Sequence, residues 1–356
     1  MSSEYQSRPI RVALVGLGRA MFADHYPFYR EHPGLFNVVC ACDIDRSRRD
    51  MVEKDYPKCK MFKRFEEMLD EPDIDLVDIA TGSLGHVEYA MMSLKRGFWT
   101  LLEPPAALTT EDMMILKGQV LKTRSRLIVM HRGLYERDFL LAKQVLGDAR
   151  LGPVNLVKIR KQDYIRRDDW QAVKRLGGGA SYYAMPDLVF QALRLLPTPP
   201  IQMWSDLKRL VSLGDAEDYV HLALKCRDGV SAEVEYSGGV LPSEREPAFE
   251  LYGEKGVFKI RAGEAVGELT MVDPKFSFPR RRSSVRTPPL EDMHEEFPVV
   301  KESIELKSDT PTGLPIFWKQ VYQSVRTGRP FPITFAEEAE AVKFTHLMKK
   351  SSAFGK

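Results

Sequence analysis

Cysteine is scarce in this sequence, with four residues among 356 and no CxxC pair. Cys40 and Cys42 alternate with apolar neighbours in a strand-like stretch, which favours buried free thiols over zinc ligands or disulfide bonds. We therefore expect no metal site. A reducing compartment follows from the same reasoning, with the cytoplasm as the default location.

Long hydrophobic runs and an excess of charge are also missing. No apolar stretch approaches the ~20 residues that a membrane helix needs, and the first eight residues lack the apolar core of a signal peptide. The 52 basic and 50 acidic residues give a net charge of +2, without the positive field typical of nucleic-acid-binding proteins. We expect neither nucleic acid nor a membrane as a partner.

The composition is that of a folded protein, with 44% hydrophobic and 29% charged residues over a length that suits two domains. In the first part, short apolar runs alternate with segments whose apolar residues recur at helical spacing. This pattern predicts an α/β fold: a Rossmann domain, with a doubly wound parallel sheet, over residues 1–131. The expected elements are strands at Ile10–Val15, Val38–Ala41, Leu76–Thr81, Thr100–Leu102 and Leu127–Met130, and helices that include Leu84–Arg96 and Glu111–Lys122.

From residue 132 to 356, successive strand-like runs with short turns predict an α+β domain with a largely antiparallel, open-faced sheet. One helix is expected between Gly177–Gly179 and Leu196, and a last helix, from about Ala336 to Lys350, is a candidate to pack back on the Rossmann domain. An open-faced sheet needs cover, so we expect a homodimer or homotetramer packed through it. The expected strands are Val154–Arg160, Val220–Cys226, Val230–Tyr236, Phe249–Gly253 and Gly256–Ile260.

The first strand leads straight into Gly16-Leu17-Gly18, which is the phosphate-binding turn of dinucleotide folds. Gly16 permits the tight turn, and Gly18 lets a pyrophosphate approach the backbone and the N–H groups of the following helix. Met21 stands in place of the third glycine of the motif, whose task is helix–strand packing. We expect its side chain to shift the helix without abolishing the site.

Asp43 follows the second strand, where a carboxylate accepts hydrogen bonds from the adenosine ribose and repels a 2′-phosphate. This placement favours NAD as the cofactor. NADP stays open, because Arg46, Arg48 and Arg49 lie close behind and are suited to a 2′-phosphate. A simple turn carboxylate is the alternative interpretation of Asp43.

Five segments in order resemble the glucose–fructose oxidoreductase / inositol dehydrogenase (Gfo/Idh/MocA) family, and the resemblance covers almost the whole chain. They are Gly16–Arg19 at the first turn, Thr81–His86 in place of T-P-N-x-x-H, Leu102–Ala106 at the E-K-P segment, Gly177–Ala180 at the G-G-G-x that opens the catalytic helix, and Phe249–Gly256 at the F-E-L-x-G-x-x-G hairpin. The resemblance implies an NAD(P)-dependent oxidoreductase that acts on a sugar, cyclitol or related polyol.

Twelve residues are expected to line the cofactor, most of them by this resemblance. For two of them an interpretation without a function also stands: His86 as an ordinary residue in the first turn of a helix, and Arg19 as a solvated helix residue. The twelve are Gly16, Gly18, Arg19, Ala20, Asp43, Arg48, Thr81, Gly82, His86, Glu103, Pro104 and Arg132.

The catalytic positions depart from the family pattern. Pro104 replaces the E-K-P lysine, Tyr183 stands at the aspartate of the catalytic helix, and Asp187 stands at its histidine. Four residues apart on one helix, Tyr183 and Asp187 are expected to share a face. The phenol then binds the substrate oxygen and the carboxylate receives the proton, with burial raising the aspartate pKa. A purely structural Asp187 is the alternative.

Other polar side chains are candidates for the substrate end. Lys161 is expected to replace the missing lysine from another direction, with surface solvation as its alternative. Arg132 suits a substrate carboxylate or phosphate, and Trp170 suits either a wall for a sugar ring or the core. The basic and aromatic segment 274–287 is interpreted as a substrate-domain loop, a subunit contact or a solvated surface loop.

The sequence leaves two further functions open. A redox-assisted lyase or hydrolase would recycle its NAD while cleaving a glycoside. A non-catalytic nucleotide-binding protein would explain the joint loss of the family lysine, aspartate and histidine.

Overall fold

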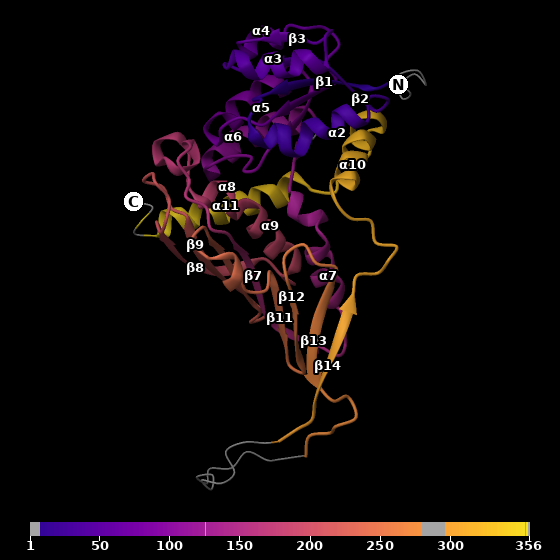
Figure 1. The fold of residues 1–356 in the computed structure, drawn as a ribbon, viewed down its shortest axis with the longest axis vertical. Helices are drawn as coiled ribbons and strands as arrows, with labels where there is room; N and C mark the ends of the chain where they lie inside the picture. Colours follow the sequence, from indigo (N-terminus) through magenta and orange to yellow (C-terminus); the bar gives the residue numbers. More distant parts are fainter. Residues whose placement is uncertain (1–7, 125, 280–295, 353, 355–356) are drawn as a thin grey trace.

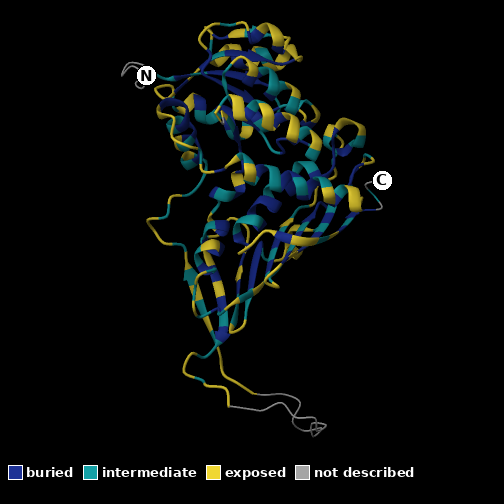
Figure 2. Cartoon of the chain, turned by 180° about the vertical axis from the view of Figure 1, so that it is seen from behind, coloured by how far each residue is buried: buried dark blue, intermediate teal, exposed yellow. Residues whose placement is uncertain are grey.

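Two β-sheets organise the computed structural model, which describes residues 8–124, 126–279, 296–352 and 354. The first sheet lies at one end of the molecule and the second at the other (Figure 1). Buried residues are concentrated in the sheets and in the helices packed against them (Figure 2). None of the helices in the described ranges is long and apolar enough to cross a membrane.

The first sheet is parallel throughout, in the strand order β3-β2-β1-β4-β5-β6. This is the order of a Rossmann domain and confirms the predicted doubly wound sheet. Strand β3 is absent from the predicted set because three residues are too few to show a pattern. The strands are β1 (Ile10–Val15), β2 (Phe36–Cys42), β3 (Lys60–Phe62), β4 (Leu76–Ile79), β5 (Trp99–Leu102) and β6 (Leu127–Val129).

Helices cover both faces of this sheet, held by two separate clusters of buried apolar side chains. The two predicted helices of this region are present with small changes at their ends. The helical elements are η1 (Met21–His25), α2 (Tyr26–Glu31), α3 (Arg46–Asp55), α4 (Phe65–Met68), η2 (Ser83–Gly85), α5 (His86–Lys95) and α6 (Thr110–Lys122).

The segment behind the glycine turn contains a π-helical turn, η1, before it continues as α2. Such turns are rare and occur often at functional sites. Met21 begins this turn and is fully buried against the first sheet, in the place where a glycine would leave room for close packing. One wider turn thus accommodates the methionine and leaves the glycine turn in front of it intact.

The second sheet has the strand order β14-β13-β12-β11-β7-β10-β9-β8. All of its neighbouring strands are antiparallel except β7 and β10, which confirms a largely antiparallel sheet. One face is buried under helices, and the other exposes side chains such as Trp204. The strands are β7 (Val154–Gln162), β8 (Pro200–Lys208), β9 (Tyr219–Cys226), β10 (Ser231–Ser237), β11 (Phe249–Gly253), β12 (Gly256–Ile260), β13 (Val266–Val272) and β14 (Val299–Glu305).

The predicted catalytic helix is in fact two helices, which corrects the expectation of one continuous helix. The first, α8 (Ala180–Tyr183), stops at Ala184, and α9 (Met185–Leu195) begins directly after it. Pro186 explains the break, because proline has no N–H for the preceding turn but is tolerated in a first helical turn. Tyr183 and Asp187 therefore belong to different helices and do not share a helix face.

The last two helices join the sheets. Helix α10 (Leu314–Thr327) returns to the first domain (Figure 1). Its Phe317 and Trp318 are fully buried in the same apolar cluster as side chains of β1. Helix α11 (Phe335–Ser351) contacts α6 of the first domain as well as α9 and β8 of the second. Both helices thus follow residue 131 in the sequence but pack against the Rossmann domain, and α10 contributes to its core.

The remaining described helices are short, apart from α7, and flank the cleft or the second sheet. They are η3 (Arg132–Tyr135), α7 (Arg137–Val145), η4 (Trp170–Ala172), η5 (Lys174–Leu176) and η6 (Pro242–Glu244).

Two smaller predictions concern cysteines and the basic aromatic segment. All four cysteines are buried free thiols, as expected. In the basic aromatic segment, Phe276 and Phe278 pack edge to face with ring centroids 5.2 Å apart. The neighbouring arginines, Arg280 to Arg282, lie outside the described residues.

Candidate active site

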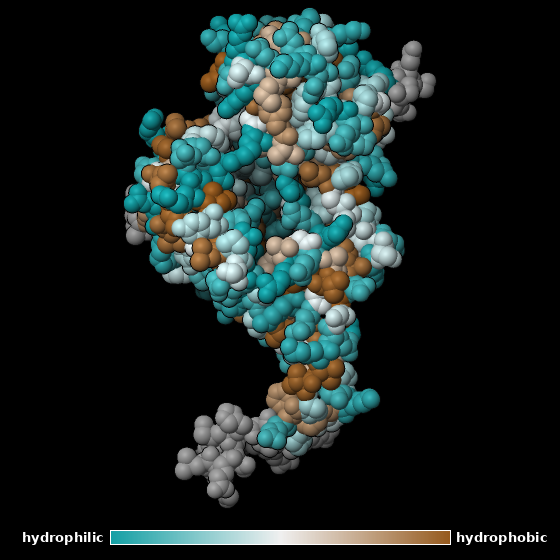
Figure 3. Space-filling model, viewed as in Figure 1, coloured by the Kyte–Doolittle hydropathy of each residue, from teal (hydrophilic) through white to brown (hydrophobic). Residues whose placement is uncertain are grey.

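A cleft of about 760 Å³ opens at the carboxyl ends of the first sheet, on the side that faces helices α8 and α9. It lies at the point between β1 and β4 where the strand order reverses, which is the ligand position in doubly wound sheets. Figure 3 shows it as a hollow rimmed mainly by hydrophilic residues. The twelve residues expected at the cofactor, together with Lys161, Tyr183 and Asp187, line this cleft, whereas Arg46 and Arg49 are not among its lining residues.

The glycine turn has the geometry that a bound pyrophosphate requires. Gly16 has φ +81°, and a Cβ there would lie 2.7 Å from the carbonyl oxygen of Ala80. A Cβ on Gly18 would meet no atom within 4 Å, so its backbone borders open space in the cleft. These residues fit a dinucleotide phosphate, because only a glycine lets the ligand approach this closely.

Asp43 is fixed beside this turn by two backbone groups. Its Oδ2 accepts a hydrogen bond from the N–H of Leu17 at 2.7 Å, and its Oδ1 from the N–H of Asp45 at 2.8 Å. Arg48 Nη1 lies 3.6 Å from the carboxylate and also borders the cleft. The carboxylate thus connects the glycine turn to the end of β2 and retains lone pairs for a ribose hydroxyl.

His86 connects the loops after β4 and β5. Its Nδ1 lies 2.8 Å from the carbonyl oxygen of Pro105, and its Nε2 lies 3.1 Å from that of Thr81. Burial lowers its pKa, so the neutral ring donates to one of these carbonyls at a time. The Pro104–Pro105 peptide bond beside it is cis. His86 therefore shapes the cleft wall, in addition to bordering the cleft.

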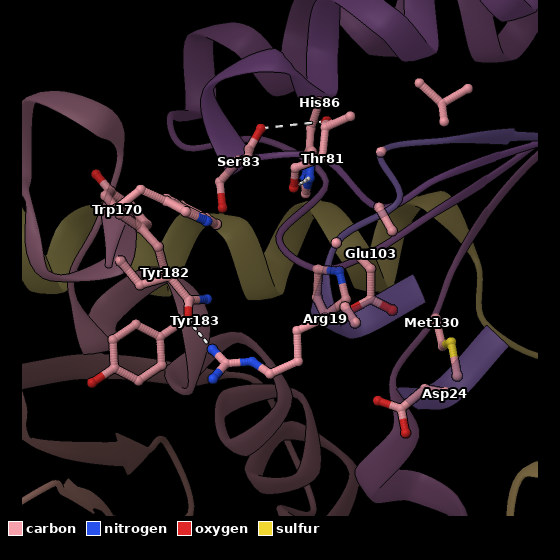
Figure 4. Close-up of a pocket in the computed structure, with 18 of the residues that line it drawn as sticks. Arg19, Asp24, Thr81, Ser83, His86, Glu103, Met130, Trp170, Tyr182 and Tyr183 are labelled. Atoms are coloured by element: carbon pink, nitrogen blue, oxygen red, sulfur yellow. Dashed lines mark hydrogen bonds between the residues drawn. The ribbon is translucent and has the colours of Figure 1, made fainter. Parts of the chain in front are cut away.

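Arg19 reaches from the glycine turn across the cleft to the opposite wall (Figure 4). Its Nη2 donates to Gln171 Oε1 at 3.1 Å and approaches Asp169 Oδ2 at 3.4 Å. The indole of Trp170 stands over Gly82, with 37% of the residue exposed. Trp170 therefore forms part of the cleft wall, not of the core.

Asp187 borders the cleft with its side chain 30% exposed and its inner side fully engaged. Its Oδ1 lies 2.9 Å from Nδ1 of His131, and its Oδ2 accepts a hydrogen bond from the N–H of Gly133 at 3.1 Å. Nε2 of His131 lies 2.6 Å from Oε2 of Glu338 on α11. The Asp187 side chain is thus only partly buried and is held by polar partners, whereas a buried side chain was expected from the sequence.

Tyr183 packs away from Asp187. Its ring lies edge to face with Tyr236 at 5.5 Å, and the guanidinium of Arg167 stands 4.4 Å from its centroid. Burial raises the pKa of its phenol above the ordinary value. Because each is held by other partners, no direct phenol–carboxylate pair forms among the described side chains. Tyr183 remains a wall of the cleft.

The two cations at the substrate end differ in their partners. Arg132 donates to Asp24 Oδ1 at 2.7 Å and to Glu136 Oε1 at 3.2 Å, so two carboxylates already engage it. Lys161 lies on the same side of β7 as the buried Ile159, at the end of the strand where the cleft begins. Within the described part of the chain, its amino group has no ion pair and is available to a ligand.

Sequence reasoning missed two buried histidines, His131 beside Asp187 and His25 in the first domain. His25, in the π turn, is fully buried, with Nδ1 at 2.9 Å from Asp78 Oδ2 and Nε2 at 2.7 Å from Glu103 Oε1. Tyr29 also donates to Asp78, at 2.7 Å. Asp78 carried a signal for this cluster, because a carboxylate in the middle of an apolar strand needs a buried partner. Its partner, a histidine 53 residues earlier, had none.

Comparisons with known proteins agree with this geometry. Residues 10–131 match the model of an oxidoreductase family with an NAD-binding Rossmann fold, and residues 139–259 match a GFO/IDH/MocA C-terminal domain. The scyllo-inositol 2-dehydrogenase (NADP(+)) IolW of Bacillus subtilis is 22% identical over 371 residues, covering 96% of this chain and 94% of that protein.

Solved structures resemble the fold over its full length. An NAD-binding protein from Listeria innocua has a TM-score of 0.80 at 18% identity, covering 97% of both chains. The WlbA dehydrogenase from Bordetella pertussis, in complex with NADH and UDP-GlcNAcA, has a TM-score of 0.75 at 20% identity, covering 97% of this chain and 96% of that one. With both family models matched in order around one cleft, the chain belongs to the Gfo/Idh/MocA family of NAD(P)-dependent oxidoreductases.

Proposed function

We propose that this oxidoreductase transfers a hydride between a nicotinamide and a secondary alcohol of a sugar or cyclitol, and that Asp187 receives the hydroxyl proton. The observation that carries the proposal is the position of Asp187. It is a partly exposed carboxylate in the same cleft as the glycine turn, where the family pattern has a histidine. The Bacillus subtilis relative, a scyllo-inositol 2-dehydrogenase, supports the substrate class.

The cofactor supplies the hydride acceptor when it is bound, and the protein supplies the positions. Gly16 and Gly18 leave room for a pyrophosphate, and Asp43 would hold the adenosine ribose. By the topology of the sheet, the loops after β4 and β5, with Thr81 and Glu103, would hold the nicotinamide half. NAD is preferred because Asp43 repels a 2′-phosphate, although Arg48 beside it offers a cation to one.

At the substrate end, the side chains complement a polyol. Asp187 accepts the proton of the hydroxyl group while the carbon that bears this group gives its hydride to the nicotinamide. Lys161, the cleft cation on β7, stabilises the oxygen that becomes the carbonyl, the task for which the E-K-P lysine is missing. Trp170 supplies an apolar wall for the ring face, and Arg132 orients Asp24 and Glu136 at the rim.

The cellular setting of this function is also a proposal. The open face of the second sheet exposes Trp204 and Ile201 at its β8 edge, and we place a second copy of the chain against it, in a cytoplasmic homodimer or homotetramer. Light scattering at micromolar concentration is expected to give twice or four times the 40.6 kDa of the chain. A monomer would contradict it.

The experiment that tests the function is a fluorescence titration with NADH and with NADPH, followed by a polyol screen. Micromolar binding, worth about 8 kcal/mol, and NADH formation from a sugar or cyclitol are expected. Lys161→Met is expected to lower kcat about 100-fold with NADH binding unchanged, while Lys158→Met, on the same strand outside the cleft, serves as the matched control.

Other outcomes would replace the proposal. Cleavage of a glycoside without net formation of NADH would identify a redox-assisted lyase or hydrolase. Firm NADH binding without turnover of any compound in the screen would identify a nucleotide-binding protein without catalysis. Tighter binding of NADPH than of NADH would overturn the assignment of Asp43.

A further inference from the structure

Asp187 is the outer end of a chain of three ionisable groups that come from three separate elements. His131 follows β6, Asp187 lies on α9 and Glu338 lies on α11, and the imidazole bridges the two carboxylates at 2.9 Å and 2.6 Å. The imidazole is fully buried and Glu338 is 3% exposed, whereas the Asp187 side chain is 30% exposed. Only one of the three groups reaches the cleft.

The position between two carboxylates favours a proton on each nitrogen of the imidazole. A neutral imidazole has one N–H donor, and two carboxylate oxygens at hydrogen-bond distance require two. Burial alone would lower the pKa of His131, but the charge of Glu338 and the hydrogen bonds to both carboxylates raise it to about 10. The ring of Phe190, stacked on the imidazole with centroids 4.2 Å apart, excludes water from one side.

The charges around Asp187 are therefore unequal on its two sides. On the inner side stands the imidazolium of His131, backed by Glu338, together with the N–H of Gly133. On the cleft side, the carboxylate of Glu136 interacts electrostatically with Asp187, and Glu136 is in turn offset by Arg132 from η3 and Lys161 from β7. The inner side is shielded from solvent, so its contribution is weakened least by water and salt.

We propose that His131 and Glu338 are positioning residues for the proton transfer, and that the buried imidazolium and its carboxylate partner set the pH range in which Asp187 accepts a proton. The inference rests on the proposed role of Asp187. His131 has no exposed surface and does not touch the substrate. In the family pattern the histidine lies on the catalytic helix. In this chain the helix carries the carboxylate of Asp187, and the segment after β6 supplies the imidazole of His131.

The first test measures the protonation of His131 directly in the full-length protein. With ¹⁵N-labelled histidine, NMR is expected to show an imidazolium that persists at about pH 8, where an unperturbed histidine is neutral. Glu338→Gln is expected to move its titration at least one unit lower. Glu340→Gln, at a surface position of the same helix, is the matched control. A His131 that titrates near the ordinary value in the unmodified protein would overturn the proposal.

The second test compares the acid limb of the kcat–pH profile, measured with the polyol that the screen identifies. His131→Asn can keep the hydrogen bond to Asp187 but removes the charge, so the carboxylate takes up a proton more readily. We expect the limb to move about one unit to higher pH. Glu338→Gln removes the anion that offsets the imidazolium, and the limb is expected to move to lower pH.

Shifts of the acid limb in opposite directions in the two variants would show that the charges of His131 and Glu338 act on Asp187. Structural damage would lower kcat without moving the limb in opposite directions. NADH affinity within twofold of the unmodified protein shows that each variant is folded. The inference would be overturned if the acid limb stayed in place in both variants or moved in the same direction in both. Asp187 would then still be the base. Unchanged activity in Asp187→Asn would instead show that Asp187 is not the base. The proposed function of Asp187, on which the inference rests, would then fail.

Discussion

His25 and His131 lie in different parts of the molecule and have nearly the same surroundings. Each is fully buried between two carboxylates, one buried and one that borders the cleft. The outer carboxylates, Glu103 and Asp187, are 23% and 30% exposed. The clusters differ in reach, because the partners of His25 all belong to the first sheet and its helices, whereas those of His131 come from the second domain and α11.

The two clusters, each a histidine between two carboxylates, therefore hold different parts of the molecule together. The cluster of His25 holds Glu103 against the Rossmann sheet, and Tyr29 gives Asp78 an additional donor. The cluster of His131 joins the end of β6 to α9 and α11, so it ties the cofactor half of the cleft to the substrate half. A buried ion pair adds little net stability over apolar packing, but removing one member leaves a costly unpaired charge.

The largest expected effect separates the outer carboxylates. Asp187→Asn is expected to lower kcat by about 10²–10⁴ with NADH affinity unchanged, because it removes the proton acceptor. Glu103→Gln is expected to weaken NADH binding about tenfold, the worth of one charge-assisted hydrogen bond. Steady-state kinetics and fluorescence titration of both variants check the comparison. Equal losses of kcat in the two would show that the clusters do not have separate roles.

The inner carboxylates provide the next comparison. Asp78→Asn is expected to lower the free energy of unfolding by about 3–5 kcal/mol, because it leaves the buried imidazolium of His25 with one anionic partner. Asp70→Asn, which breaks an exposed ion pair with Arg96, is the matched control and is expected to cost at most about 1 kcal/mol. Urea unfolding followed by tryptophan fluorescence measures both. Similar losses in both variants would remove the distinction between buried and exposed pairs.

The smallest effect is a pH dependence that both histidines share. Burial alone would lower the pKa of His25, but the charge of Asp78 and the hydrogen bonds to Asp78 and Glu103 raise it from 6.5 to about 10. A raised pKa gives stability that is complete below pH 6.5 and is lost as the pH rises toward 10. We expect the free energy of unfolding to fall as the pH rises through this window.

His25→Gln provides the control for this effect, because it removes one of the two titrating groups. Its unfolding free energy, measured in urea at several pH values, is expected to depend less steeply on pH than that of the unmodified protein. A stability that rises between neutral and alkaline pH would contradict the charged state of both histidines.

The parts of the structure that could be predicted are those with local signals. The alternation of apolar runs and amphipathic segments is read within a dozen residues, and Gly16 and Gly18 follow directly on a strand. The residues predicted for the cofactor therefore line one cleft, because they follow strand ends of a parallel sheet, and these meet at one edge. Strands β8, β13 and β14 were harder to predict, because β8 begins at a proline, β13 contains Gly267, and the edge strand β14 alternates exposed and half-buried residues.

The Rossmann sheet, the glycine turn and the family could be predicted from the sequence, since they depend on patterns within short segments. Which side chains meet depends instead on how distant elements pack together. The tertiary structure divided the catalytic helix at Ala184, gave Tyr183 and Asp187 different partners, and placed Glu338 behind a histidine 207 residues earlier in the chain. Such pairings arise because a buried charge must find a partner wherever the packed elements bring one, and no local pattern records that distance.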